Sequence, residues 1–442
     1  MIAALSLLPT LKLIRLIALG VPLWLMALLL PAGWLAGLAY LVLLTALCWR
    51  DVNTIPRASE LSARRELPPR FALGVDQSLT LVLLNRSALA LLAWVRDEVP
   101  ESFESRDELP PVHLPPHGEA RLHYTVRPLK RGAHAFGDVV LRVHGQHGLT
   151  QRQMTLTVGD TVKVYPNFRG ADQYPLLAKT DRQQESARKP RPFKAAGTDF
   201  ESLRPYIAGE DPRNIDWKAT ARRGALISRN RQVEKGQQLA VLLDAGRLMA
   251  ETIGAYSRLE HAINATVMLS YVAQKRGDAL AVAAFSNQLE SFLPPVRGPA
   301  LLGRVLESLY AVEARPVESD YWQVIAQLMA LLRRRSLVIL LTDVLDATAS
   351  AGLIHNLARA AERHVVLCVV LTEPLIGAIA HSVPATVEET YRKAAACDQV
   401  RRRALALENL RSRGILVLET DPAHLSVHLV QRYLEIRQAD LQ

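Results

Sequence analysis

Apolar and polar positions follow three different patterns along the chain, and the first is an uncharged run near the start. Residues 16–49 contain no charged side chain and are almost wholly apolar. One membrane-spanning helix needs about 20 apolar residues, so this run suits two short helices. Pro31 and Gly33 interrupt it, because proline lacks a helical N–H donor and glycine permits a turn. We therefore predict a transmembrane helical hairpin, with helices near Ile14–Leu30 and Trp34–Trp49.

Basic residues flank this hairpin at both ends. Lys12 and Arg15 precede it, and five arginines follow it, namely Arg50, Arg57, Arg64, Arg65 and Arg70. An excess of Lys and Arg marks the cytoplasmic side of a membrane, and both ends of a hairpin share one side. We therefore expect a multi-pass protein of the cell inner membrane whose soluble domains are cytoplasmic. The alternative, a cleaved signal peptide, would have an apolar core of only about 7–15 residues.

The second pattern consists of short alternating segments between residues 51 and 170. Turn-forming clusters of Gly, Pro, Asn and Ser separate them. The expected strands are Ser78–Asn85, Arg121–Val126, Val139–Val143, Met154–Val158 and Thr161–Tyr165. Many short strands at such spacing are typical of an antiparallel β-sandwich.

The third pattern, over residues 236–442, alternates apolar strands with amphipathic helices. The expected strands are Leu239–Leu243, Ala279–Phe285, an antiparallel Glu290–Leu293, Ser336–Leu341, His364–Leu371 and Ile415–Leu418. The expected helices are Arg258–Arg276, Pro299–Val312, Tyr321–Leu332, Leu353–Glu362, Val387–Ser412 and Ser426–Arg437. This alternation predicts an α/β domain with a mainly parallel, doubly wound sheet. Ligand sites in such sheets gather at the carboxyl ends of strands, where Asp244 and Asp343 are expected.

Between the last two patterns, residues 171–235 are rich in Arg, Lys, Pro, Gly and Asp. The candidate residues of this basic segment are Arg204, Tyr206, Asp211, Arg213, Asp216, Trp217 and Arg222. Arginine pairs with carboxylates through two hydrogen bonds and stacks on aromatic rings. Because acidic residues nearly balance the basic ones here, we favour a network that joins the two flanking domains. A docking surface for a phosphate or an acidic partner is the alternative.

Residues 204–222 also resemble a known family. The string Arg-x-Tyr-x-x-Gly-Glu-Asp-x-Arg-x-Ile-Asp-Trp-x-Ala-x-Ala-Arg is similar to the signature of a bacterial membrane protein family with a domain of unknown function. Glu210 stands where that family commonly has Asp. Members are often encoded beside MoxR-type AAA+ ATPases, so the resemblance implies such an ATPase as partner. It also implies that the C-terminal domain is von Willebrand A-like.

Von Willebrand A domains often bind Mg²⁺ through Asp-x-Ser-x-Ser, a later Thr and a further Asp. Here the first motif reads Asp-Ala-Gly-Arg-Leu from Asp244, so both serines are lost, and of the ligands only Asp244 and Asp343 match. Mg²⁺ demands near-octahedral oxygen ligation, so we expect a degenerate site and no cofactor, with bound Mg²⁺ as the alternative. We expect Arg247 or another cation to replace the metal electrostatically and to keep both carboxylates ionised.

Composition narrows the function further. The net charge of +10 would suit an anionic partner, but a nucleic-acid surface should be less neutralised by acids, so we expect no nucleic acid. No phosphate-binding loop or nucleophile–base pair is evident, so no catalytic residue is assigned. We predict a membrane-anchored scaffold or adaptor that binds a protein partner. The alternative is a metal-dependent hydrolase or transferase that uses the two aspartates on a phosphorylated or cell-wall substrate.

Overall fold

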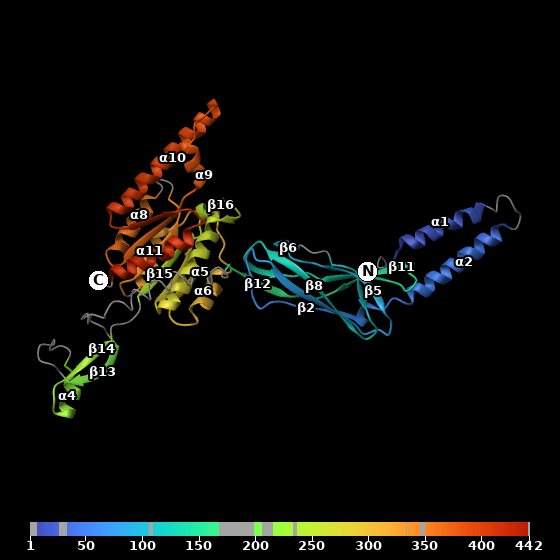
Figure 1. Ribbon diagram of the computed structural model, residues 1–442, viewed down its shortest axis with the longest axis horizontal. Helices are drawn as coiled ribbons and strands as arrows, with labels where there is room; N and C mark the ends of the chain where they lie inside the picture. Colours follow the sequence, from blue (N-terminus) through green and yellow to red (C-terminus); the bar gives the residue numbers. More distant parts are fainter. Residues whose placement is uncertain are drawn as a thin grey trace. The chain divides into compact units, whose positions relative to one another are not determined.

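The computed structural model describes residues 7–25, 33–105, 109–167, 199–205, 215–232, 237–332, 334–344 and 350–440. They fall into two compact units, Met1–Asn167 and Phe168–Gln442 (Figure 1). The protein is therefore multidomain and mixed α/β, as predicted. The finer division into segments 1–50, 51–170, 171–235 and 236–442 stays a prediction.

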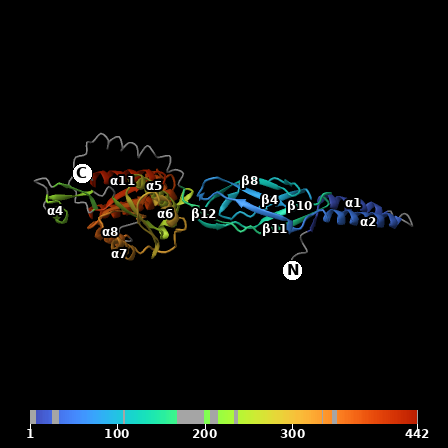
Figure 2. The ribbon, with the colours of Figure 1, turned by 90° about the horizontal axis from the view of Figure 1, so that it is seen from below.

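The first unit begins with two helices, α1 (Leu11–Leu25) and α2 (Gly33–Val52), which lie side by side in both views (Figures 1 and 2). Within the described part of the chain, one helical segment, Trp34–Val52, is long and apolar enough to cross a membrane. Most of its surface is not covered by protein. Both helices begin before the predicted positions, and residues 26–32 lie outside the described part.

Close packing between α1 and α2 depends on two glycines. A side chain on Gly20 would meet the ring of Tyr40, and one on Gly37 would meet the ring of Trp24. The Tyr40 hydroxyl donates a hydrogen bond to the backbone carbonyl of Leu16 at 2.6 Å. The hairpin is thus held by ring–backbone contacts, while most of its other described apolar side chains are exposed and Leu13 is buried.

The carboxylate of Asp51 fastens the end of α2 to the β-strands that follow. It is fully buried and accepts hydrogen bonds from the backbone N–H groups of His147 at 2.7 Å, Leu149 at 2.9 Å and Thr150 at 2.7 Å. Gly145 passes so close that an added Cβ would lie 2.5 Å from the carboxylate. Charged hydrogen bonds of this kind are strong, so the joint is firm.

The start of α1 is attached to the same turn. Strand β1 (Leu7–Pro9) pairs with β11 (Thr150–Leu156). The Thr10 hydroxyl lies within hydrogen-bonding distance of the carbonyls of Gly148 and Leu149, at 2.7 and 2.9 Å. Both ends of the helical hairpin therefore meet at the turn of residues 145–149.

Three mostly antiparallel sheets complete the first unit, with strand orders β1-β11-β10-β5-β7, β2-β4-β8-β6 and β3-β12-β9. Only β3 and β12 run parallel. The further bounds are β2 (Leu61–Glu66), β3 (Phe71–Ala72), β4 (Gln77–Asn85), β5 (Leu91–Asp97), β6 (Phe103–Ser105), β7 (Val112–Leu114), β8 (Glu119–Pro128), β9 (Gly132–Ala135), β10 (Val139–His144) and β12 (Thr161–Tyr165). The five predicted strands correspond to β4, β8, β10, β11 and β12, whereas the other strands of this unit, among them β2 and β5, were not predicted.

A buried ion pair connects two of these sheets. Arg65 of β2 lies 2.6 Å from the carboxylate of Asp97 on β5, and both side chains are at most 2% exposed. The Tyr124 hydroxyl donates to the same carboxylate. The sequence interpretation counted Arg65 among the basic residues beside the membrane, which is wrong, because its charge is used inside the β-domain.

In the second unit, β13 (Asp199–Pro205) pairs antiparallel with β14 (Ile227–Gln232), and α4 (Trp217–Arg223) lies between them in sequence. The α/β domain that follows has a six-stranded sheet in the order β19-β18-β15-β20-β21-β22. All neighbours are parallel except β19, which pairs antiparallel with β18 at one edge.

Helices cover both faces of this sheet (Figure 2). Apolar residues of α7, α8 and α10 pack on one face, and α5, α6 and α11 lie on the other. The strands are β15 (Gln238–Asp244), β18 (Ala279–Phe285), β19 (Leu289–Val296), β20 (Leu337–Thr342), β21 (Val365–Leu371) and β22 (Leu416–Thr420). The helices are α5 (Arg258–Arg276), α6 (Leu301–Leu309), α7 (Tyr321–Leu331), α8 (Ala351–Ala361), α9 (Pro374–His381), α10 (Val387–Ser412) and α11 (Leu425–Asp440). Of these, only α9 was not predicted.

Candidate functional site

The two aspartates predicted at the carboxyl edge of the sheet lie at the ends of two neighbouring strands. Asp244 ends β15, Asp343 follows β20, and these two strands are neighbours. In sequence order the strands run 3-2-1-4-5-6, so β15 and β20 flank the point where the order reverses. Crevices at that point of a doubly wound sheet are the usual ligand sites.

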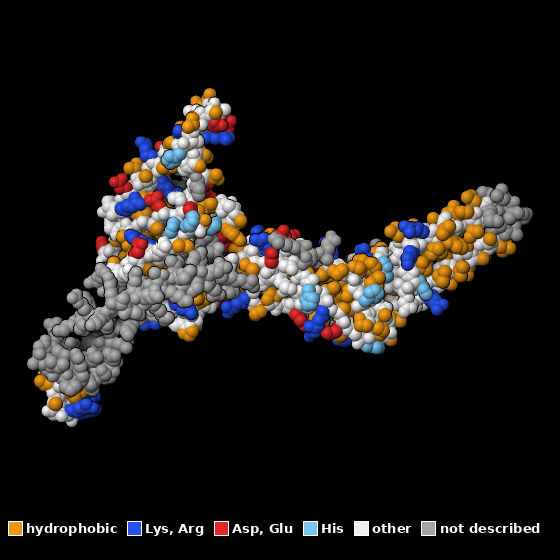
Figure 3. Space-filling model, in the orientation of Figure 1, with side chains coloured by type: hydrophobic (Ala, Val, Ile, Leu, Met, Phe, Trp, Pro, Cys, Tyr) orange, Lys and Arg blue, Asp and Glu red, His pale blue; other side chains and the backbone are white. Residues whose placement is uncertain are grey.

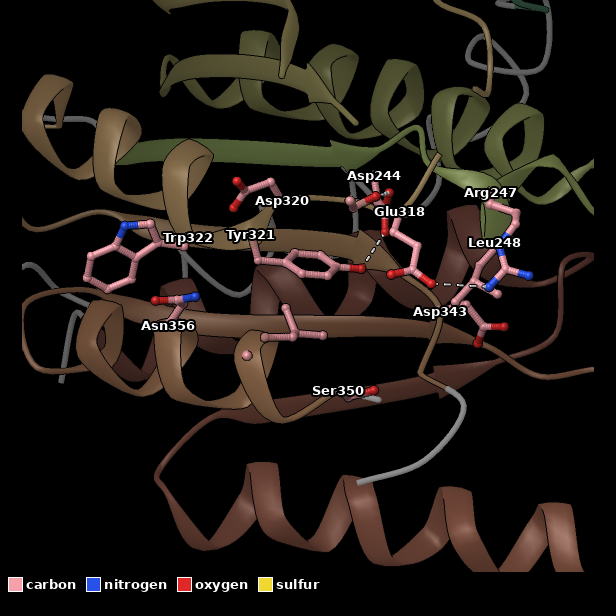
Figure 4. Close-up of a pocket in the computed structure, with 13 residues that line it drawn as sticks. Asp244, Arg247, Leu248, Glu318, Asp320, Tyr321, Trp322, Asp343, Ser350 and Asn356 are labelled. Carbon is pink, nitrogen blue, oxygen red and sulfur yellow. Dashed lines mark hydrogen bonds and ion pairs between the residues drawn. The ribbon is translucent and has the colours of Figure 1, made fainter. Parts of the chain in front are cut away.

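A cavity of about 580 Å³ opens there (Figure 4). Its polar and aromatic lining comes from the end of β15, the start of α7 and the start of α8. Residues that line the cavity include Asp244, Arg247, Glu318, Ser319, Tyr321, Trp322 and Asp343.

Asp244 is 2% exposed, and the chain itself saturates its carboxylate. The backbone N–H of Gly246 donates at 2.8 Å, and the hydroxyls of Ser319, Tyr321 and Thr342 lie at 2.5, 2.7 and 2.6 Å. Figure 4 shows the Tyr321 ring pointing its hydroxyl at this carboxylate. Burial, and then the charge of Asp244, raise the pKa of Tyr321 far above its usual value, so it stays a neutral donor.

Asp343 pairs with two arginines that come from different helices, α5 and α10. Arg258, the first residue of α5, donates to one carboxylate oxygen, and Nη2 of Arg403 on α10 lies 3.3 Å from the other. Arg258 is itself buried and also contacts Glu251 at 2.8 Å and Glu373 at 3.4 Å. The positive charge beside Asp343 is therefore supplied by the chain.

Arg247 does not play the part expected of it. Its guanidinium lies 3.6 Å from the carboxylate of Glu318, and the two side chains are 61% and 89% exposed. Figure 4 shows this pair at the cavity, with the dashed contact running from Glu318 to Arg247. The cations that accompany an aspartate are Arg258 and Arg403, and they pair with Asp343 and not with Asp244.

This arrangement is a poor fit for Mg²⁺. In the part of the chain that the structure describes, no group of three or more His, Cys, Asp or Glu residues is placed to hold a metal. Both oxygens of Asp244 already accept hydrogen bonds, and a dication near Asp343 would meet two guanidinium groups. Mg²⁺ needs a nearly octahedral set of free oxygen ligands. The donors present do not provide one.

The residues of the basic segment are only partly placed. Tyr206, Asp211 and Arg213 lie outside the described residues, and for Arg204 only the backbone, in β13, is described. Asp216 caps α4, since its carboxylate accepts from the backbone N–H of Ala219 at 3.0 Å.

Trp217 and Arg222 are exposed on α4, the tryptophan to 68%. Among the described residues, the donors to Asp244 and Asp343 all come from the α/β sheet and its connections. Whether the basic segment joins domains or docks a partner therefore stays a prediction.

Four residues of the site were missed from the sequence, namely Ser319, Tyr321, Arg258 and Arg403. Ser319 and Tyr321 are 75 and 77 positions away from Asp244, and Arg258 is 85 away from Asp343. One signal was available, because Ser-Asp-Tyr precedes a helix and puts hydroxyls at its start. No local pattern marks the arginines, which resemble ordinary helix residues.

Comparison with known proteins finds one family model that matches part of the chain. Residues 202–397 match the family model described as "Protein of unknown function DUF58". The match covers β13, α4 and the α/β domain as far as α10, which is less than half of the chain. It includes the whole of residues 204–222, the segment whose sequence resembles a bacterial family.

A curated relative is also similar. "Uncharacterized protein YeaD" of Bacillus subtilis is 22% identical over 172 residues, which are 39% of this chain and 40% of that protein. The matched region thus spans well under two thirds of the relative's length.

Likenesses to solved structures are limited to small parts. A Salmonella alpha-2-macroglobulin mutant matches with a TM-score of 0.20 and 18% identity, over 26% of this chain and 7% of that one. A C. elegans MSP family member, WR4, matches with a TM-score of 0.16 and 12% identity, over 23% of this chain and 96% of that one. These scores are too low to establish a shared fold.

Proposed function

We propose that the chain is a membrane-anchored scaffold or adaptor, not an enzyme, and that it binds a protein partner at the cavity beside Asp244 and Asp343. The observation that carries this proposal is the saturation of both carboxylates by the chain's own donors. A general base or a metal ligand needs a free lone pair directed at the substrate or the ion. These two groups instead stiffen the edge of the sheet.

The rim of the cavity suits protein contact. Trp322, at the start of α7, is 55% exposed, and the guanidinium of Arg359 on α8 lies 5.0 Å from its ring centre. Tryptophan and arginine are enriched among residues that dominate binding energy at protein interfaces. A tryptophan already oriented by a cation loses little entropy when a partner covers it.

The finer architecture is part of the proposal. We interpret the hairpin as two membrane spans, the sheets of residues 51–170 as a β-sandwich, and the parallel sheet as a von Willebrand A-like domain. The outward-facing apolar side chains of α1 and α2 support the first interpretation, and the strand order supports the third. The two ends of the hairpin meet at one turn, which supports a single side for both ends, and the basic residues that flank the hairpin are the basis for proposing that this side is cytoplasmic.

A MoxR-type AAA+ ATPase is the partner we propose. Its support is the resemblance of residues 204–222 to a family often encoded beside such ATPases. An adaptor without chemistry of its own would complement a partner that hydrolyses ATP.

Affinity capture tests the partner and its docking site together. Tagged full-length chain, extracted from membranes under ATP-trapping conditions, should retain an AAA+ ATPase. Trp322→Ala should weaken the interaction by at least about 30-fold, the effect of losing a dominant contact of 2 kcal/mol or more.

Trp217→Ala is the matched control, because Trp217 is also exposed, to 68% against 55% for Trp322, but lies on α4. Loss of binding in Trp217→Ala with retention in Trp322→Ala would move the docking surface to the basic segment. Recovery of no AAA+ protein with the unaltered chain would remove the proposed partner.

Calorimetry tests the part of the proposal that excludes a metal-dependent enzyme. The full chain in detergent should take up neither Mg²⁺ nor Mn²⁺ at one ion per chain. Tight stoichiometric binding that disappears in Asp244→Ala would favour the alternative, a metal-dependent hydrolase or transferase.

A further inference from the structure

A second pocket lies at the base of the helical hairpin, within the first unit, and the proposed adaptor role does not use it. Its volume is about 380 Å³, and its polar lining comes from Thr10, Lys12, His144, Gly148 and Gln151. One wall is thus the first turn of α1, and the other is the pair β10–β11 with its turn. This volume lies at the lower end of the range found for small-molecule sites.

Lys12 carries the charge of this pocket. It is exposed, and it makes no ion pair with the residues that the structure describes. Its ammonium lies across the turn at Gly148, 3.4 Å from where a Cβ of that residue would stand. Gly148 has a φ of +66°, so glycine suits this position on two grounds.

The surroundings of Lys12 are basic and lack a free acid. Arg15 lies one turn further along α1 and Arg50 near the end of α2; both are exposed, and neither forms an ion pair within the described ranges. The nearby carboxylate of Asp51 is fully buried and occupied by the turn. Figure 3 shows basic side chains at the base of the hairpin and an apolar surface that continues outward from them.

His144 forms a neutral wall of the pocket. Burial, the largest influence, lowers the pKa of His144 below its usual value, so the ring is uncharged at neutral pH. The imidazole stacks on Trp94 with 4.1 Å between ring centres. The positive charge therefore comes from Lys12 and not from the histidine.

We infer that this pocket binds the phosphate-bearing headgroup of one anionic phospholipid. Lys12 pairs with the phosphate, and Gln151 lines the same pocket as a further polar group. The acyl chains then follow the exposed apolar side chains of α1, among them Ile14 and Ile17. The continuity of a cationic pocket with a membrane-facing apolar surface favours a lipid over a soluble anion.

The test uses full-length protein in lipid nanodiscs that contain phosphatidylcholine and a minor fraction of phosphatidylglycerol. Native mass spectrometry of the released protein counts the lipids that stay bound. We expect about one phosphatidylglycerol per chain and no comparable retention of phosphatidylcholine. Lys12→Gln should lower the retention about fivefold, the effect of one basic residue at an anionic membrane surface.

Lys130→Gln is the matched control, because it removes the same charge from an exposed turn before β9. That strand pairs with β12, which lies at the end of the unit away from α1 and α2 (Figure 1). Equal retention in Lys12→Gln and the unaltered protein, or equal retention of both lipids, would overturn the inference. Release of the bound lipid by excess inorganic phosphate would show a site for free phosphate and would overturn it as well.

Discussion

Each unit has a buried ion pair between an arginine and an aspartate, and the two pairs differ in their surroundings. Arg65 and Asp97 are enclosed between β-strands, and the remaining guanidinium N–H groups of Arg65 donate to the carbonyls of Val158 and Gly137 and to the carboxylate of Asp160. Arg258 and Asp343 are as deeply buried but lie at the open edge of a parallel sheet. The difference is the cavity next to the second pair.

This comparison teaches that a buried ion pair is not by itself a sign of function. The Arg65 pair joins two sheets, and breaking it would leave a charge in the β-domain core. The Arg258 pair has the extra partners Glu251, Glu373 and Arg403, so its charge is spread over several groups at the surface of the site. The Arg258 pair differs from the Arg65 pair because it lies at the point where the strand order of the parallel sheet reverses.

The largest expected effect is in the enclosed pair. Arg65→Met should destabilise the β-domain by about 3–5 kcal/mol, because Asp97 loses its buried cation. Hydrogen exchange of peptides from β2 and β5 measures this locally. Arg64→Met is the control, since Arg64 pairs with Glu66 at 3.2 Å in solvent and should change protection little. Similar losses in both variants would show that Arg65 has no special part.

A smaller loss is expected at the open pair. Arg258→Met leaves Asp343 with Arg403, so the free energy of unfolding should fall by about 2 kcal/mol, the value of a charged hydrogen bond. Hydrogen exchange of β20 reports it. The double variant with Arg403→Met should lose more than the sum of the two single changes. Strict additivity would mean that the arginines do not share the carboxylate.

Alkaline pH should weaken both regions to a similar degree. Burial and a neighbouring aspartate raise the pKa of Tyr124 and Tyr321 far above the usual value. Each tyrosine therefore stays protonated when folded but ionises when unfolded above about pH 10, so stability is full below that pH and falls above it.

The slope should be about 1.4 kcal/mol per pH unit for each tyrosine. Urea unfolding of the detergent-solubilised chain across this pH range, followed by hydrogen exchange, measures the slope. Tyr124→Phe should flatten it in the β-domain alone, and Tyr321→Phe in the α/β domain alone. An unchanged slope in either variant contradicts the assignment.

The smallest effect is expected for Arg247→Gln. The ion pair with Glu318 is exposed and 3.6 Å long, so the unfolding midpoint should stay within the error of measurement. A marked destabilisation would restore Arg247 as the cation that accompanies the aspartates.

How far the sequence predicts the structure differs between the same two units. In the α/β domain the helices Arg258–Arg276 and Val387–Ser412 begin and end where apolar spacing and caps place them. In the β-domain β2 was not predicted, because its sequence, Leu-Ser-Ala-Arg-Arg-Glu, is polar and basic and follows the predicted membrane hairpin. Arg65 of this strand is buried because it pairs with Asp97, which is 32 residues away in the sequence.

The site shows the same limit. Asp244 and Asp343 were found because they end apolar strands, which is a local signal. What they do is decided by Ser319, Tyr321 and Arg258, which are brought to them by tertiary folding. Spacing in the chain carries no information about such partners. The sequence therefore could not show that the carboxylate of Asp244, considered as a metal ligand, already accepts hydrogen bonds from the chain.

The attachment of both hairpin helices to the turn of residues 145–149 has a mechanical consequence. Asp51 ties the end of α2 to that turn, and Thr10 ties the start of α1 to it, so the described joint contains no hinge. A torque on the β-domain therefore reaches both helices at once and tilts them as a single lever. In the proposed two-span arrangement, pulling the hairpin out of a bilayer would require moving two apolar helices together, which makes it far harder to dislodge than either helix alone.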